Sequence, residues 1–166
     1  MGYARLDPRA GAPARGGSKK KEPPEQTPDA CLGRSRGGYS TKIHAGIDAL
    51  GNAVRLIATA GQAGDCPQAL PLLEGLETER VIADTSYDSD ENRAYCAQKQ
   101  IEVVIPSHPN RKEEIPLDAD WYADRNQIER YFNRMKRHRR LATRYEKTTI
   151  SFLACWLIAS ALDWLR

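Results

Sequence analysis

The chain has 166 residues, of which 28% are charged, with a formal net charge of +3 and four cysteines. This length suits one domain with a substantial hydrophobic core. The cysteines form no C-x-x-C pair, which argues against a zinc site. The N-terminus lacks the apolar core of a signal peptide, and the apolar run at 150–165 is short for a membrane span and contains Asp163. We therefore expect a cytoplasmic protein with no membrane partner.

Residues 1–38 are rich in Gly, Pro, Arg and Lys and predict a disordered or irregular basic segment. From Tyr39 onward, an alternating run, a turn at "LGN" and a second β-rich run predict a hairpin. Apolar runs then alternate with helical patterns, which is typical of an α/β fold with a mixed sheet. The predicted order is strands at 39–49 and 53–61, a helix at 65–76, a strand from 79, a helix at 88–100, a strand at 101–107, and helices at 120–143 and 148–166.

The charges are grouped along the chain. Residues 1–42 carry nine Lys/Arg against four Asp/Glu, residues 43–124 carry six against fifteen, and residues 125–147 carry nine against two. Two basic blocks around an acidic centre indicate a polyanionic partner, of which nucleic acid is the commonest. A solvated helix face and a basic tail would give the same pattern, and charge alone does not choose between them.

The run "VIADTSYDSDEN" places acidic residues after a buried strand. Asp84 lies at the strand end, where α/β proteins bind ligands, so it is a candidate ligand for a hard cation such as Mg²⁺. Asp88, Asp90 and Glu91 allow the same reading, but we favour capping and the helix dipole for them, with Asp88 or Ser89 as the N-cap.

The predicted helix at 120–143 has three faces. At about 100° per residue, Tyr122, Arg125, Glu129 and Lys136 fall within an arc of about 60°. Ile128, Tyr131, Phe132 and Met135 form a neighbouring apolar stripe, and Arg130, Arg134 and Arg137 lie on a third face. An i,i+4 ion pair between Arg125 and Glu129 would explain two residues of the first face but not all four.

The spacing Tyr122-x2-Arg125-x3-Glu129-x6-Lys136 resembles the Y-R-E-K signature of DDE transposases from bacterial insertion sequences. Five ordered blocks resemble those of the IS-five family within the IS-four superfamily. They are "LGRSRGGYSTKIHAGIDALGN", "ATAGQAGD", "VIADTSYDSD", "VVIPSHPNRK" and "RNQIERYFNRMKRHRRLATRYEK", and the resemblance covers about residues 32–166.

The resemblance implies an RNase H-like fold and a triad of two aspartates and a glutamate that holds two Mg²⁺ ions. Asp84 matches the second aspartate and Glu129 the glutamate, while Tyr122, Arg125 and Lys136 match residues expected to contact DNA or phosphate. The implied partners are DNA (element ends and target) and a second copy or an intact transposase, near the bacterial nucleoid. The further basic residues expected to bind DNA are Arg34, Arg36, Lys42, Arg130, Arg134, Arg137 and Arg140.

The N-terminus departs from the family pattern, whose first aspartate lies on the opening strand in a block like D-S-T-x-V-R-A-H-Q-H. Here the region reads "MGYARLDPRAGAPARGG", and Pro8 follows Asp7 directly. A coding sequence for the family block read two nucleotides out of phase can give "LDPRAGAPAR". Our hypothesis is that residues 1–16 are out of frame and that Asp7 is an accident of the shift.

This departure has a functional consequence. We expect a truncated catalytic domain at 39–166 that lacks the first strand and the first metal-binding aspartate. The leading function is therefore a DDE transposase, with Mg²⁺-dependent strand cleavage and transfer, that is inactive by itself. The alternative is a non-catalytic DNA-binding remnant of a transposase.

Overall fold

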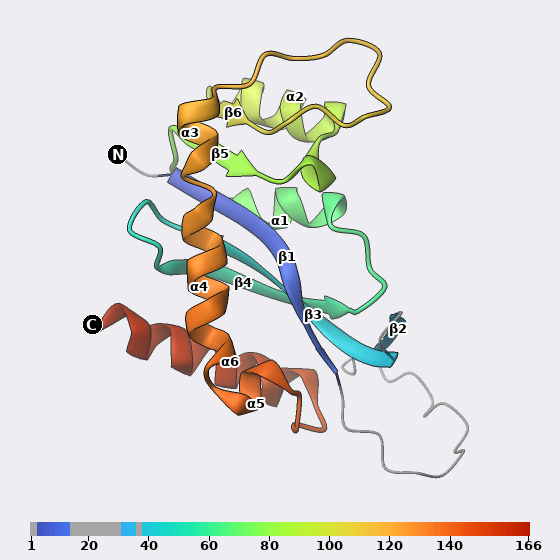
Figure 1. Cartoon of the computed structure of the whole chain (residues 1–166), viewed down its shortest axis with the longest axis vertical. Coiled ribbons are helices and arrows are strands. Elements are labelled where there is room, and N and C mark those ends of the chain that lie inside the picture. Colours follow the sequence, from blue (N-terminus) through green and yellow to red (C-terminus); the bar gives the residue numbers. More distant parts are fainter. Residues whose placement is uncertain (1–2, 14–30, 36–37) are drawn as a thin grey trace.

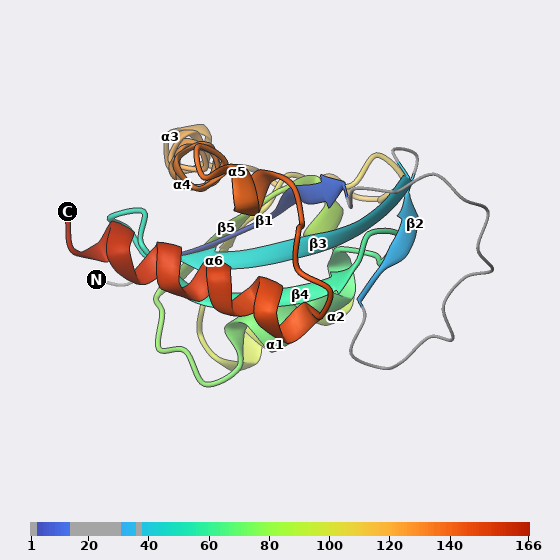
Figure 2. The same cartoon turned by 90° about the horizontal axis from the view of Figure 1, so that it is seen from below.

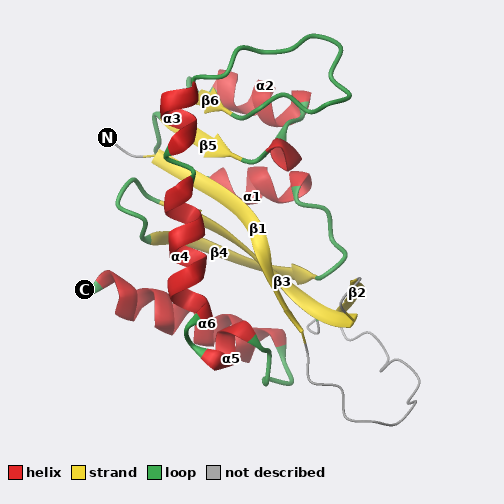
Figure 3. Ribbon diagram, in the orientation of Figure 1, coloured by secondary structure: helices red, strands yellow, loops and turns green. Residues whose placement is uncertain are grey.

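The computed structural model describes residues 3–13, 31–35 and 38–166, with backbone only for 3–13 and Ser35. Its strands form one six-stranded sheet and its helices pack around it (Figure 3). The strands are β1 (Tyr3–Pro13), β2 (Gly33–Ser35), β3 (Gly38–Ile47), β4 (Ala53–Ala60), β5 (Arg80–Ala83) and β6 (Glu102–Val104). The helices are α1 (Ala69–Leu73), α2 (Asp90–Gln98), α3 (Ala119–Ala123), α4 (Asn126–Lys136), α5 (Arg139–Ala142) and α6 (Thr149–Trp164), with short 3-10 turns η1 (Cys66–Gln68) and η2 (Thr85–Tyr87).

The sheet is mixed, as the sequence predicted. Its order is β2-β3-β1-β5-β6, with β4 also paired to β3. The pairs β1–β3, β2–β3 and β3–β4 are antiparallel, and β1–β5 and β5–β6 are parallel. Since a parallel connection needs a crossover, a helix lies between successive parallel strands, and α2 joins β5 to β6.

Strand β1 corrects two expectations. The sequence predicted an irregular segment over 1–38 and a sheet without its first strand, but Tyr3–Pro13 is a strand between β3 and β5. The local pattern missed it because Pro8 cannot donate to a ladder, and the register shift between Asp7 and Ala10 accommodates this break. Pairing with strands on both sides outweighs the weak local preference.

The β3–β4 hairpin is confirmed. Its turn is closed by the Asp48 carboxylate, whose Oδ1 accepts from the amides of Leu50 and Asn52, both at 2.9 Å. Gly51 adopts a φ of +87°, which favours glycine because a Cβ is disfavoured there. The turn fixes the hairpin register, which places Ile43, Ala45 and Ile47 in the core.

Two hydrophobic clusters cover the two faces of the sheet, and Figure 2 shows α4 and α1 on opposite sides of it. One cluster joins β3 to α4, α5 and α6, with Trp156 fully buried at its centre. The other packs α1 and α2 against β5. The predicted apolar stripe of α4 lies in the first cluster: Ile128, Tyr131, Phe132 and Met135 are all buried.

The single helix predicted at 120–143 is wrong. The structure has three helices there, α3, α4 and α5, with breaks at Asp124–Arg125 and Arg137–His138. The backbone of Asp124 and Arg125 stays close to helical, so the first break is slight. The backbone of His138 is extended, with φ −79° and ψ 106°, so the helix ends at the second break and the chain changes direction there. This redirection lets α5 and α6 fold back against α4.

Candidate functional site

Asp84 lies at the C-terminal end of β5. The preceding Val81, Ile82 and Ala83 are at most 1% exposed, so the strand is anchored in the core. The half-buried Asp84 caps η2, and its Oδ1 accepts a hydrogen bond from the Thr85 amide at 2.7 Å. The structure thus places this carboxylate at a strand end, as the sequence predicted.

Helices α3 and α4 bring three residues of the resemblance together. The Arg125 Nη2 donates to the Glu129 Oε1 at 2.5 Å, and the two side chains are 20% and 31% exposed. The Arg125 guanidinium carbon lies 5.7 Å from the centre of the Tyr122 ring. The i,i+4 pair is therefore present. The two residues are four apart, as in an ion pair on a helix surface, although Arg125 is the cap residue that precedes α4 rather than a residue of the helix.

Asp84 and Glu129 both act on the same guanidinium. Partial burial alone would lower the pKa of Arg125, but the charges of Tyr122, Glu129 and Asp84 raise it above its usual value. Helix α4 packs across β1, as Figure 1 shows. Glu129 is bonded directly to this guanidinium, and the charge of Asp84, from a distant part of the sequence, adds to the rise of its pKa.

The backbone register places Asp7 next to Asp84. Leu6 pairs with Ala83 as the last pair of the parallel β1–β5 ladder. Asp7, the next residue of β1, and Asp84, which directly follows the end of β5, each come one residue after that pair. Sequence reasoning did not find this position, because it rejected β1 as a strand. Among the side chains that the structure describes, which exclude Asp7, no group of three or more His, Cys, Asp or Glu could hold a metal ion.

The donor chemistry of Asp84 and Glu129 fits a hard divalent cation. Mg²⁺ is commonly bound through one or two carboxylates, with waters and substrate phosphates completing the shell. Arg125 is the counter-charge of Glu129 in this structure, and a bound cation would take its place at that carboxylate. The two carboxylates suffice for one metal ion, and a second ion would need a further ligand.

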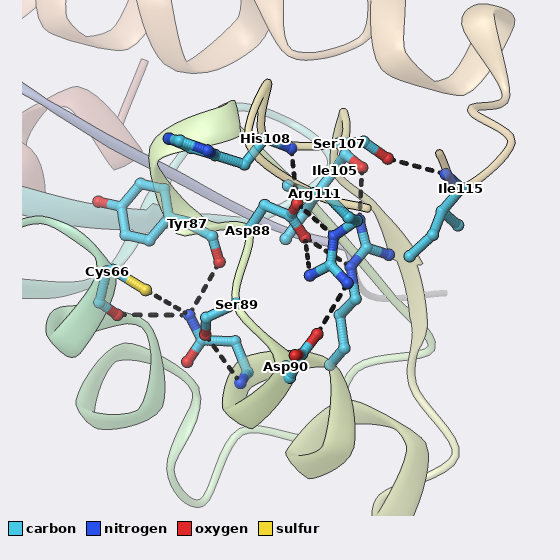
Figure 4. A network of polar contacts seen from close by, with 12 residues as sticks. Cys66, Tyr87, Asp88, Ser89, Asp90, Ile105, Ser107, His108, Arg111 and Ile115 are labelled. Atoms are coloured by element: carbon cyan, nitrogen blue, oxygen red, sulfur yellow. Dashed lines mark hydrogen bonds and ion pairs between the residues drawn. The ribbon is translucent and has the colours of Figure 1, made fainter. Parts of the chain in front are cut away.

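In the acidic run after Asp84, the carboxylates of Asp88 and Asp90 are bound by arginine side chains of the protein (Figure 4). Ser89, not Asp88, caps α2, with its hydroxyl accepting from the Asn92 amide at 3.1 Å. Asp90 and Glu91 lie in the first turn of α2, where the helix dipole favours them. Asp88 is bound by Arg93 and Arg111.

The predicted DNA-binding residues fall into groups. Arg130 and Arg137 are exposed on α4 and at its end, and Lys136 is exposed beside them. Arg34 is exposed on β2, while Arg36 lies outside the described residues. The remaining three are held by ion pairs with acidic side chains of the protein: Lys42 with Asp65, Arg134 with Asp163 and Arg140 with Glu146.

Sequence reasoning missed Arg93 and Arg111 as part of this region. The sequence pattern assigned Arg93 only to the predicted helix at 88–100, and Arg111 only to the polar segment between the strand at 101–107 and the helix at 120–143. The signal that could have found Arg111 is its place in the block "VVIPSHPNRK", downstream of an acidic run of opposite charge. The pairing spans 23 residues, so no local pattern reports it.

Comparison with known proteins identifies the chain. The family described as "Transposase DDE domain" matches residues 13–164. The chain belongs to this DDE transposase family. The match leaves Asp7 outside it, whereas Asp84 and Glu129 lie within it.

Two insertion-sequence transposases are similar to this DDE transposase chain. The Brucella ovis protein named "Putative transposase for insertion sequence element IS6501" is 43% identical over 129 residues, which are 76% of this chain and 99% of that protein. The Neisseria meningitidis serogroup B transposase for insertion sequence element IS1106 is 37% identical over 85 residues, 49% of this chain and 30% of that protein. Within the described part of this chain, no helix is long and apolar enough to cross a membrane.

Proposed function

We propose that this chain is the catalytic part of an insertion-sequence transposase of the IS-five family, with an RNase H-like fold and the Y-R-E-K signature. The observation that carries the proposal is the placement of Asp84 at the end of β5 and of Glu129 in a cluster with Arg125 and Tyr122 on α3 and α4. The family match and the two similar transposases support it. The substrate is DNA, and the reaction is strand cleavage followed by strand transfer.

Asp84 and Glu129 would hold a Mg²⁺ ion. The metal supplies charge neutralisation and an activated oxygen nucleophile at the scissile phosphate. Arg125, paired with Glu129, would bind a phosphate oxygen of the DNA, and its planar fork suits that contact. Tyr122, whose ring lies beside Arg125, would orient the guanidinium. The exposed Lys136, about two helix turns beyond Glu129, would bind the DNA backbone.

We propose that the chain does not cleave DNA by itself. The family match begins after Asp7, and Pro8 follows Asp7 directly. The backbone position beside Asp84 is nevertheless the place where a first aspartate would complete the site. Asp7 stands at this point of β1, but in a sequence context unlike the family block, and we expect it not to serve as the first aspartate.

The test compares the chain with a variant in which residues 7–16 are replaced by the block D-S-T-P-V-R-A-H-Q-H, so that the aspartate of the block stands at position 7. Both are incubated with Mg²⁺ and a plasmid that carries the ends of the source element. We expect cleavage only by the variant, and its loss on Glu129→Gln. Cleavage by the unaltered chain that Asp7→Asn abolishes would show instead that Asp7 is the first aspartate. Absence of cleavage by both proteins would count against the proposed activity.

The second candidate is a DNA-binding remnant without catalysis. The exposed side chains of Arg130 and Arg137 favour it, because they can reach DNA phosphates. Arg134 and Lys42, in contrast, would first have to leave their ion pairs with Asp163 and Asp65. It predicts salt-dependent binding to nonspecific duplex DNA with no cleavage, even by the block-restored variant.

A further inference from the structure

The Asp88 carboxylate is a buried hub, shown in Figure 4. Its side chain is fully buried, and Arg93 Nε donates to Oδ1 at 2.6 Å. Arg111 donates from Nε to Oδ2 at 2.9 Å and from Nη2 to Oδ1 at 3.0 Å, which is the paired geometry of an arginine fork. The His108 amide donates to Oδ2 at 2.7 Å. Both oxygens are thus bound by the protein, so Asp88 has no exposed oxygen for a metal or for DNA.

The turn before this hub carries Asp84. The Tyr87 amide donates to the Asp84 carbonyl at 2.9 Å, and the Asp88 amide to the Thr85 carbonyl at 3.0 Å. Asn92 Nδ2 binds the Tyr87 carbonyl at 2.9 Å from the other side. These bonds make 84–88 a hydrogen-bonded turn, so the Asp88 side chain is connected to the strand end at Asp84 through a short, ordered piece of backbone.

Arg111 comes from the segment that leads to the other carboxylate. Residues 105–118, all of which the structure describes, contain neither helix nor strand and connect β6 to α3. Its backbone is held within the segment by the Ile115 amide to Ser107 Oγ at 2.9 Å and the Arg111 amide to the His108 carbonyl at 2.8 Å. The His108 amide, at 2.7 Å from Asp88 Oδ2, and the Arg111 fork together join this segment, which precedes Glu129, to the Asp84 turn.

We propose that Arg111 is a positioning residue that sets the distance between the Asp84 and Glu129 carboxylates. It acts through Asp88 and touches neither metal nor DNA. This inference rests on the proposed function, since it assumes that Asp84 and Glu129 share a metal ion. Partners one shell outside metal ligands change metal affinity by about 10–100-fold when removed.

The experiment is a Mn²⁺ titration of the full chain by calorimetry, which needs no catalytic activity. We expect Arg111→Gln to weaken Mn²⁺ binding by about tenfold. Arg111→Lys keeps the charge without the fork, so it should recover part of the affinity and is the variant to use if Arg111→Gln does not fold. The matched control is Glu102→Gln, which removes the exposed Arg80–Glu102 pair at the opposite end of β5 and β6 and should leave Mn²⁺ affinity unchanged.

The outcomes separate the two proposals. Binding that is lost in Asp84→Asn but unchanged in folded Arg111→Gln and Arg111→Lys overturns the positioning role alone, even if both variants melt at lower temperature. A wild-type chain that binds no Mn²⁺, or binding that survives Asp84→Asn, removes the proposed metal site and the positioning role with it. Weaker binding in Arg111→Gln, partial recovery in Arg111→Lys and no change in Glu102→Gln support the role.

Discussion

Replacing Asp88 with asparagine removes the buried carboxylate that both Arg93 and Arg111 bind. Asparagine can accept on one side, but its amide group faces donors on the other, so at least one of these arginine bonds is lost, although Arg111 keeps its ion pair with Asp90. Breaking a buried pair costs about 3–5 kcal/mol. Because the two arginines are 16% and 18% exposed and can partly rehydrate, we expect a loss of about 3 kcal/mol in the free energy of unfolding. For a domain of this size that corresponds to a melting temperature lower by about 6–12 °C.

The effect should depend on pH in a defined direction. Burial alone would raise the pKa of Asp88, but hydrogen bonds from Arg111, the His108 amide and Arg93 hold it well below its usual range. The unfolded chain takes up the proton near about pH 3.9, so the stabilisation is present above that pH and is lost as the pH falls toward the folded value.

Urea unfolding followed by circular dichroism at several pH values measures both effects. The control is Asp90→Asn, because Asp90 also binds Arg111 but its side chain is 91% exposed, so it should change stability by about 0.5 kcal/mol or less. The reasoning is refuted if Asp88→Asn costs no more than this control at pH 7. It is also refuted if the gap between wild type and Asp88→Asn stays constant down to about pH 2.

Three further predictions concern DNA binding, pH and the core. Replacing both Arg130 and Arg137 with glutamine should reduce the slope of log affinity against log salt for duplex DNA by about 2, as measured by fluorescence anisotropy. The control Arg134→Gln should leave this slope unchanged, because Asp163 binds this arginine. Burial lowers the pKa of His44 to about 4, so stability should fall by about 2–3 kcal/mol as the pH drops from 7 to 4; a His44→Gln chain that shows the same fall in urea titrations would contradict this. Trp156→Ala should cost about 3–5 kcal/mol in the same assay, and a loss below about 1 kcal/mol would mean that the cluster on this face is not packed around Trp156.

The sequence predicted those elements whose periodicity matches their burial. The apolar stripe of α4 was found because residues three and four apart share a helix face, and the hairpin was found because alternating residues share a sheet face. Asp84 was found because a run of buried strand residues ends there. In each case the information lies within about ten residues of chain, which is the range that a local pattern covers.

The missed features depend on distant partners. β1 was rejected on its own residues, yet β3 and β5 pair with both of its edges. The Arg111–Asp88 pair joins a loop to a turn 23 residues earlier, and neither segment has a periodic pattern. The break after α4 at His138 was missed because the charged run "RMKRHRRLA" is compatible with a continuing helix, and only the fold-back of α6 requires the turn.

The central claim is that Asp84 and Glu129 hold one metal ion. Manganese binding followed by electron paramagnetic resonance tests it directly, with wild type, Asp84→Asn, Glu129→Gln and the acidic control Asp90→Asn compared at one pH. We predict one bound Mn²⁺ in wild type and in Asp90→Asn, and loss of that binding in Asp84→Asn and in Glu129→Gln. Binding that is equal in all four proteins, or that is lost in only one of the two carboxylate variants, would contradict a shared metal site.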